Sequence, residues 1–258
     1  MSYDRLAVRA VIEAARTGGR NALSPAECRA LCEACGIPLP KAAMASSAAE
    51  AGRAAHALGF PVVMKIVSPD ILHKTEAGGV VLNVRSAGEA EQAYEKIVAG
   101  ARAYKRDAKV AGVEIQQMLS GGQEVIVGAT ADPGFGKVVA FGLGGVLVEV
   151  LKDITFRLAP ASRDDALSMI NGIAAAEILN GVRGSAAVDK GALGAIIETV
   201  SSLAADFPEI TELDLNPVLA RPDGAVALDV RVLLDFAPPV ERFRPSREEI
   251  LRAMNRIM

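Results

Sequence analysis

The sequence predicts a mixed α/β (α+β) fold divided into two lobes. Helical segments alternate with apolar strand-like runs in both halves of the 258-residue chain, and turn motifs between some runs indicate that part of the sheet is antiparallel. A chain of this length can form one large domain or two modest lobes. We expect an N-terminal tail or helix at 1–20, an N-terminal lobe at 21–118, a C-terminal lobe at 119–236, and a linker and C-terminal helix at 237–258.

Capping boxes mark the beginnings of the expected helices. In this pattern a serine precedes an acidic residue by three positions, and the two side chains satisfy free backbone amides of the first helical turn. Ser24 with Glu27 is one example, and Gly36 supplies the stop of that helix. The helices predicted in this way cover about 25–35, 48–58 and 87–103, a shorter segment after Ser162, and a C-terminal segment after Ser246.

Strands are expected at the apolar runs between these helices. Two of the intervening turns, Ser120-Gly121-Gly122 and Arg221-Pro222-Asp223-Gly224, have the composition of hairpin turns. The predicted strands are 61–67, 79–84, 112–119, 123–129, 137–142, 146–150, 211–219 and 225–230.

Composition excludes several classes of protein. The net charge of −3 and the pI near 5.6 argue against a nucleic-acid-binding protein, because affinity for a phosphate backbone needs a basic surface. We find no apolar run near the ~18 residues of a transmembrane helix. The start of the chain carries acidic residues and lacks the apolar core of a signal peptide. We therefore expect a cytoplasmic protein that does not associate with membranes.

Three cysteines allow two interpretations. Cys28, Cys32 and Cys35 have the spacing of a radical-SAM iron–sulfur site. With Leu31 they also form one apolar stripe along the predicted helix at 25–35. Small buried thiols are ordinary core residues, and we favour the core helix over the cluster.

The segment after the strand at 61–67 gathers residues that could hold a phosphate group. Lys65, His73, Lys74, Glu76 and the pair Gly78-Gly79 fall within fifteen positions. A cation in an apolar strand is costly unless it meets an anion, and glycines allow backbone N–H groups to approach phosphate oxygens. Alternatively, Lys65 is an edge-strand or snorkelling lysine, and His73 is a structural or surface histidine.

A second group of polar residues lies near the C-terminus of the predicted fold. Asp214 and Asn216 share one face of a strand, and Asp229 falls opposite Asn216 if the turn at 221–224 closes a hairpin. Oxygen ligands on a rigid hairpin suit Mg²⁺, which completes its shell with water and nucleotide phosphates. The alternative is a polar, solvent-facing side of the strand.

Known nucleotide-binding motifs are missing from the sequence. The glycine-rich turn at 142–145 lacks the third glycine of a GxGxxG fingerprint, and we find no GxxxxGK[ST] P-loop. Any nucleotide must therefore be held by another scaffold. In such a scaffold Glu124, near the start of an apolar strand, could hold a ribose hydroxyl.

Several ordered blocks of sequence resemble one known family. The blocks are PVVMKIVSPDILHKTEAGGV (61–80), QEVIVGATADPGFGKVVAFGLGGVLVEVLKDITFRLAP (123–160), LNGVRG (179–184) and ELDLNPVLARPDGAVALDV (212–230). Together they resemble the ATP-grasp subunit of ADP-forming acyl-CoA synthetases, a group that includes acetate–CoA ligases and is related to the β subunit of succinyl-CoA synthetase. The resemblance covers about 22–236 and implies an ATP-grasp fold, in which two lobes clamp a nucleotide.

The resemblance also implies roles for individual residues. Lys65 resembles the lysine that contacts nucleotide phosphates, Glu124 the acid near the ribose, and His73 the histidine that relays a phosphoryl group. The segment 116–118 resembles the inter-lobe hinge beside adenine, where glutamines replace the glutamate of the succinate enzyme. The candidate nucleotide-binding residues are thus Lys65, Lys74, Glu76, Gln116, Gln117, Met118 and Glu124, and the candidate Mg²⁺ ligands are Asp214, Asn216 and Asp229.

The implied reaction is acyl-CoA + ADP + phosphate ⇌ carboxylic acid + CoA + ATP, with ATP or ADP and Mg²⁺ as cofactors. An imidazole such as that of His73 is a competent phosphoryl carrier near neutral pH, and nearby cations would offset the charge on the transferred group. The CoA-binding and acyl-binding domains of the family are missing from this sequence. We therefore expect a CoA-binding α subunit as the partner in a hetero-oligomer, and we expect that subunit to select the acyl group.

Two other functions are considered. A stand-alone ATP-grasp carboxylate–amine ligase would need no phosphohistidine, so the block around His73 argues against it. A non-catalytic nucleotide-sensing partner would bind nucleotide without turnover, and the candidate residues Lys65, His73, Asn216 and Asp229 argue against that function.

Overall fold

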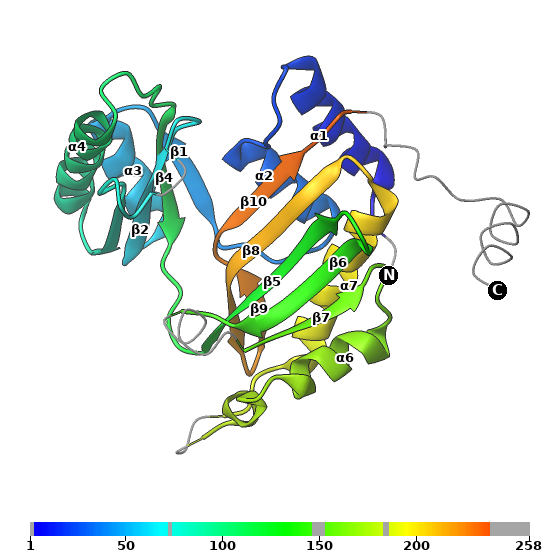
Figure 1. The fold of residues 1–258 in the computed structure, drawn as a ribbon. Coiled ribbons are helices and arrows are strands. Elements are labelled where there is room, and N and C mark those ends of the chain that lie inside the picture. Colours follow the sequence, from blue (N-terminus) through cyan, green and yellow to red (C-terminus); the bar gives the residue numbers. More distant parts are fainter. Residues whose placement is uncertain (1–2, 72–73, 146–152, 183–185, 238–258) are drawn as a thin grey trace, which may run out of the picture.

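A computed structural model describes residues 3–71, 74–145, 153–182 and 186–237 of the chain. These residues form two lobes that lie side by side (Figure 1). The strand expected at 146–150 and the helix expected after Ser246 lie outside the described residues.

The small lobe is a four-stranded antiparallel sheet, ordered β1-β4-β2-β3, with two helices packed on one face. Along β2, Val62, Met64 and Ile66 pack in the core with these helices, so that Lys65 lies on the opposite face. Figure 1 shows α3 and α4 on the outer side of the sheet and the sheet on the side of the large lobe. The elements are β1 (Ala42–Ala45), α3 (Ala48–Leu58), β2 (Val62–Val67), β3 (Val80–Val84), α4 (Ala87–Tyr104) and β4 (Gly112–Gln117).

The large lobe contains a six-stranded antiparallel sheet, ordered β10-β8-β5-β6-β7, with β9 paired to β8. Its core lies between one face of this sheet and the helices of the lobe. The elements are β5 (Gln123–Asp132), β6 (Gly136–Leu143), β7 (Ile154–Leu158), α6 (Arg163–Gly172), the 3-10 helix η1 (Ala176–Asn180), α7 (Lys190–Asp206), β8 (Ile210–Arg221), β9 (Gly224–Ala227) and β10 (Val230–Leu234).

The first two helices, α1 (Arg5–Thr17) and α2 (Pro25–Ala34), also pack on the large lobe. Ile12 and Leu31 are fully buried in the same core as the six-stranded sheet. Backbone hydrogen bonds join the segment between the two helices to β10, the edge strand of that sheet. We expected a tail or helix at 1–20 and an N-terminal lobe that begins at 21, whereas both α1 and α2 pack on the large lobe.

The two expected hairpin turns have different outcomes. The turn at 221–224 joins β8 to β9 as an antiparallel hairpin, which confirms the prediction. The prediction for 120–122 is wrong, because this segment leads from β4 in the small sheet to β5 in the large one. Gly122 has a φ of 109°, and a Cβ there would meet the carbonyl of Ala220. The glycine is therefore needed for the crossing between the lobes.

The cysteines lie in a core helix, as expected. Helix α2 has the full capping box of Ser24 and Glu27. The three cysteines are buried free thiols, and burial raises the pKa of Cys28 to about 12. Among the described residues, no three His, Cys, Asp or Glu side chains are grouped so as to hold a metal ion.

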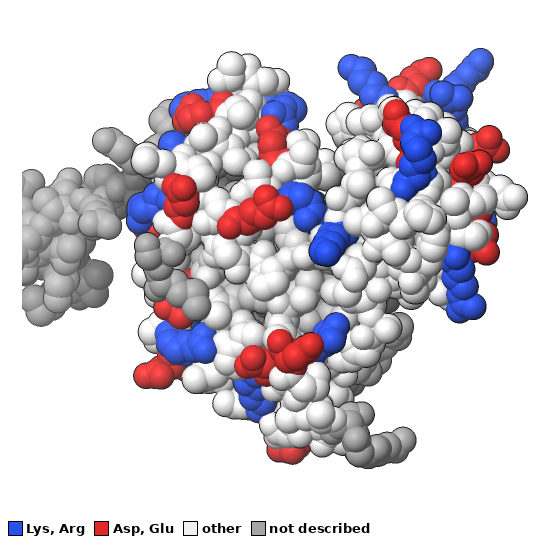
Figure 2. Space-filling view, turned by 180° about the vertical axis from the view of Figure 1, so that it is seen from behind, with Lys and Arg blue, Asp and Glu red and all other residues white. Residues whose placement is uncertain are grey.

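Within the parts of the chain that the structure describes, no helix combines the length and the apolar character needed to span a membrane. On the face of the molecule that Figure 2 shows, basic and acidic side chains are interspersed over both lobes. This mixture of charges agrees with the small net charge of the sequence.

Candidate functional site

Lys65 of the small lobe forms a hydrogen bond to the large lobe. It lies on β2, which is flanked by β4 and β3 and is therefore not an edge strand. Its Nζ donates a hydrogen bond to the backbone carbonyl of Leu228 in the large lobe at 2.8 Å. Burial lowers the pKa of Lys65, while the nearby carboxylates of Asp229 and Glu114 act in the opposite direction. The position of β2 inside the sheet excludes the edge-strand interpretation. The lysine instead reaches an acceptor in the other lobe.

Gln116 donates to the same carbonyl from the neighbouring strand. It lies on β4 opposite Val63, and the residue is only 5% exposed. Its Nε2 donates to the Leu228 carbonyl at 3.0 Å. One backbone oxygen of the large lobe therefore accepts two hydrogen bonds from side chains of the small lobe, which is the full capacity of its two lone pairs.

Lys74 forms an ion pair across the same boundary. Its Nζ lies 3.1 Å and 3.2 Å from the two carboxylate oxygens of Asp229. A turn holds Lys74 in place, because its carbonyl accepts a hydrogen bond from the amide of Gly79 at 2.8 Å. The amide of Gly78 donates to the carbonyl of Thr75. Both glycine amides thus donate to backbone carbonyls within the turn.

Glu76 and His73 belong to the same segment. Glu76 is exposed on the turn that follows Lys74. His73 lies outside the described residues. The structure therefore fixes the position of Lys74, which follows His73, but gives no geometry for the imidazole.

The candidate metal ligands lie on β8 and just before β10. The amide of Asn216 donates to the carbonyl of Asp229 at 3.2 Å, so the two residues are opposed, as the sequence predicts. Asp214 lies further along β8, opposite Arg231, and burial raises its pKa. Carboxylate and amide oxygens are the hard donors that Mg²⁺ takes. The donor chemistry therefore fits a Mg²⁺ ion that completes its shell with water or phosphate.

The remaining candidates lie near the connection between the lobes. The amide of Gln117 donates to the carbonyl of Lys41 at 2.8 Å, and the amide of Met118 to that of Pro61 at 3.2 Å. Glu124 is exposed at the start of β5, and its carbonyl accepts a hydrogen bond from the amide of Gly144 at 2.7 Å. These contacts of Gln117, Met118 and Glu124 lie outside the cluster around Leu228. That cluster contains Lys65, Gln116, Lys74 and Asp229.

Sequence reasoning missed two partners in this cluster, Glu114 and the Leu228 carbonyl. Glu114 pairs with Lys65 in the small sheet, and Arg29 of α2 lies 3.9 Å from its carboxylate. A usable signal for Glu114 was its i, i+2 spacing from Gln116, which places both on one face of β4. A small pocket of about 40 Å³, lined by residues of both lobes, lies at this point.

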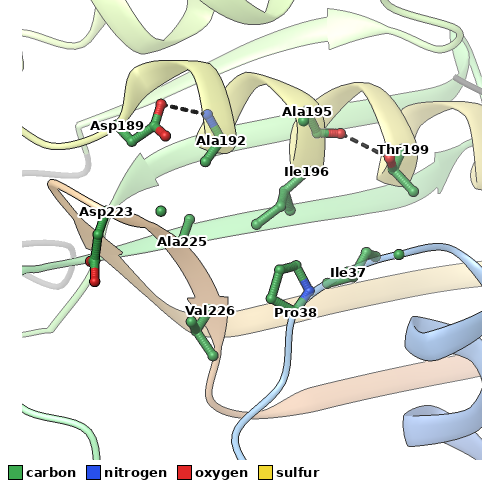
Figure 3. A pocket seen from close by; sticks show the side chains of 12 residues that line it. Ile37, Pro38, Asp189, Ala192, Ala195, Ile196, Thr199, Asp223, Ala225 and Val226 are labelled. Atoms are coloured by element: carbon green, nitrogen blue, oxygen red, sulfur yellow. Dashed lines mark hydrogen bonds between the residues drawn. The ribbon is translucent and has the colours of Figure 1, made fainter.

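A larger cavity, of about 380 Å³, lies elsewhere on the large lobe (Figure 3). Small and apolar side chains of α7, of β9 and of the segment after α2 form most of its lining. Its polar groups have local partners: the Asp189 carboxylate accepts from the Ala192 amide at 2.9 Å, and Thr199 donates to the Ala195 carbonyl at 2.8 Å. The cavity contains none of the candidate residues.

Comparisons with known proteins agree with this arrangement. Residues 14–234 match the family model described as an ATP-grasp domain. The β subunit of ADP-forming acetate–CoA ligase I from Pyrococcus furiosus is 47% identical over 232 residues, which cover 90% of this chain and 100% of that subunit. In several longer relatives, including two ADP-forming acetate–CoA ligases from Archaeoglobus fulgidus, the chain spans only 29–31% of the length.

Solved structures extend the match. Acetyl-coenzyme A synthetase 1 from Ca. Korarchaeum cryptofilum, in complex with coenzyme A, Ca-AMPCP and HgCl+, superposes with a TM-score of 0.85 at 39% identity, over 88% of this chain and 99% of that chain. A second structure of that protein contains coenzyme A and Mg-AMPPCP, with its phosphohistidine segment pointing towards the nucleotide-binding site. It gives a TM-score of 0.76 at 37% identity, over 88% and 100% of the two chains. These matches confirm the expected fold, and the chain belongs to the ATP-grasp family of ADP-forming acetate–CoA ligase β subunits.

Proposed function

We propose that this chain is the nucleotide-binding β subunit of an ADP-forming acyl-CoA synthetase, which catalyses acyl-CoA + ADP + phosphate ⇌ carboxylic acid + CoA + ATP. The observation that carries the proposal is the meeting of Lys65 and Lys74 of the small lobe with Leu228 and Asp229 of the large lobe. This arrangement places two cations and a carboxylate at the boundary between two lobes, where the family binds its nucleotide.

Each part of the cluster has a task in this proposal. Lys65 and Lys74 bind the phosphates of the nucleotide, with Glu76 on the same turn. Asn216 and Asp229 supply oxygen ligands to Mg²⁺, and Asp214 lies further along the same strand. When bound, Mg²⁺ supplies positive charge that offsets the charge of the transferred phosphoryl group.

The other end of the nucleotide is assigned to residues at the connection between the lobes. Glu124 binds the ribose, and Gln117 and Met118 lie beside the adenine. Gln116 differs from these two neighbours, because its buried amide is already bonded to the Leu228 carbonyl. We therefore assign Gln116 to holding the lobes together rather than to contacting the base.

His73 is assigned to the phosphoryl relay. Its imidazole nitrogen would accept the phosphoryl group from the partner's half of the reaction and then pass it to the terminal phosphate of ADP, which yields ATP and restores the free imidazole. The assignment rests on the sequence block from Lys65 to Gly79. The position of Lys74, one residue further on, supports it, because Lys74 lies beside Asp229.

The proposal includes a CoA-binding α subunit as the partner and a cytoplasmic location. The relative in Pyrococcus furiosus is itself a β subunit, and the present chain covers its full length. In the longer relatives, by contrast, the region matched by this chain is less than a third of the protein. A separate α subunit would supply the remainder.

Titration of the purified chain with ADP and Mg²⁺ tests the nucleotide half of the proposal, and incubation with acetyl-CoA, ADP, phosphate and Mg²⁺ tests the dependence on a partner. We expect ADP binding but no ATP formation until an α subunit is added. Sustained ATP formation by the chain alone would favour a self-contained ligase. A lack of Mg²⁺-dependent ADP binding would overturn the assignment of the site.

A further inference from the structure

The contacts between the lobes are of two kinds, and the first is costly to break. The Leu228 carbonyl accepts hydrogen bonds from Lys65 at 2.8 Å and from Gln116 at 3.0 Å. Gln116 is buried and Lys65 is half-buried. Separating the lobes here would exchange two hydrogen bonds at once for hydrogen bonds to water, at a net cost that is larger for the charged donor Lys65. This contact should therefore persist.

The second contact, at the adjacent residue, is easier to exchange. The side chains of Lys74 and Asp229 are 27% and 40% exposed, so water reaches both members of the ion pair. An exposed ion pair of this kind favours the paired over the separated side chains by a factor of only about 1.4 to 5. A competing cation can thus replace the ammonium at little cost.

We propose that Lys74 is the resident counter-ion of Asp229, and that a divalent cation arriving with the nucleotide displaces it while the lobes stay joined at Leu228. This inference rests on the proposed function, because it takes Asp229 as a metal ligand. The displaced ammonium needs another anion, and the nucleotide phosphates supply one. Lys74 is therefore neutralised by Asp229 before binding and by phosphate afterwards.

Both members of the ion pair line one small pocket at this boundary. Lys74 and Asp229 share this pocket of about 40 Å³ with Gln116 and Leu228. A divalent cation that enters it meets the Asp229 carboxylate with the Lys74 ammonium only 3.1 Å away, and the two positive charges repel each other. Moving the Lys74 side chain away from Asp229 relieves this repulsion.

Binding of Mn²⁺ to the nucleotide-free full-length chain, followed by electron paramagnetic resonance, tests the exchange. Lys74→Met keeps the length of the side chain but removes the competing charge, so we expect it to raise the Mn²⁺ affinity about two- to fivefold. Lys74→Arg should bind Mn²⁺ like the wild type. Lys105→Met is the matched control, because Lys105 pairs with Asp70 at 3.2 Å within the small lobe. Equal or weaker Mn²⁺ binding by Lys74→Met would overturn the inference.

Two further measurements separate this inference from the proposed function. Asp229→Asn should lose the Mn²⁺ binding, and if it binds like the wild type, Asp229 is not the ligand and the exchange fails. ADP binding and partner-dependent ATP formation could then still hold. By small-angle X-ray scattering, Lys74→Met should keep the radius of gyration of the wild type, because the Leu228 contact remains. A marked expansion would contradict that part.

Discussion

Removing the two donors of the Leu228 carbonyl, singly and together, should reveal strong coupling between the lobes. Gln116→Leu deletes one hydrogen bond while Lys65 still satisfies the carbonyl, so we expect a loss of about 1 kcal/mol in the free energy of unfolding. Lys65→Met leaves Gln116 in place and also removes a cation that burial disfavours. Its net effect should lie within about 1 kcal/mol of zero.

The double variant leaves the carbonyl without either donor. Leu228 is half-buried, and an acceptor left unpaired away from water costs up to about 3 kcal/mol. The double variant should therefore be less stable than the sum of the single effects by about 1–3 kcal/mol. The chain has no tryptophan, and urea unfolding is therefore followed by far-ultraviolet circular dichroism.

A control variant and a threshold for additivity complete this double-mutant cycle. Gln123→Leu serves as the control, because Gln123 forms only an exposed hydrogen bond of 3.4 Å to the carbonyl of Glu124. Combined with Lys65→Met it should be additive. If Gln116→Leu and Lys65→Met also add to within about 0.5 kcal/mol, the shared-acceptor reasoning is refuted.

Three further predictions concern the metal site, the turn before β3 and acid stability. Asp229→Asn should weaken Mg²⁺-ADP binding severalfold in calorimetry, because it removes a charged oxygen ligand; unchanged affinity would leave only a polar surface. Gly79→Ala should destabilise the chain by roughly 1–3 kcal/mol, because its Cβ would overlap a side chain of β2, whereas Gly88→Ala, with open space around it, should not. Equal urea midpoints for these two variants would contradict this reasoning. Hydrogen bonding to Arg20 lowers the pKa of Glu27 to about 2 from 4.5, so its contribution to stability is complete above pH 4.5 and lost as the pH falls towards 2. Glu27→Gln should lack this dependence in acid titrations, and identical acid curves would exclude it.

Local signals in the sequence were sufficient for several elements. Capping boxes predicted α2, α3 and α4 to within one or two residues of their observed bounds, because serine and an acidic residue at this spacing satisfy the free amides of a first turn. The strands β2 and β8 were found from apolar runs and alternation. In each case the side chains that decide the structure lie within the element.

Elements whose structure depends on distant partners were missed. The strand β1 (Ala42–Ala45) has few β-forming residues and exists through its pairing with β4. Helix α7 is buried on most of its surface, so it lacks the polar stripe by which an amphipathic helix is recognised. The composition of Ser120-Gly121-Gly122 suits a hairpin turn as well as a crossing between two sheets. The packing of α1 and α2 on the large lobe is likewise a tertiary effect.

For the candidate site, too, contacts between residues far apart in the sequence could not be predicted. Lys65 was conspicuous as a cation in an apolar strand, and the opposition of Asn216 and Asp229 followed from the hairpin turn. The ion pair of Lys74 with Asp229 joins residues 155 positions apart, and the acceptor of Lys65 is a backbone carbonyl, which has no signature in a sequence. Residue types could therefore suggest the cluster, but its partners required the fold.

The rate of ATP formation from acetyl-CoA, ADP, phosphate and Mg²⁺ by the chain combined with its α subunit tests whether His73 relays the phosphoryl group. His73→Asn should reduce this rate by several orders of magnitude while ADP still binds, because the asparagine amide lacks the nucleophilic nitrogen of an imidazole. His56→Asn is the matched control, since His56 is the only other histidine of the chain and lies on α3 against Phe60. We predict near-normal ATP formation for His56→Asn and almost none for His73→Asn. Near-normal ATP formation by His73→Asn would contradict this relay role.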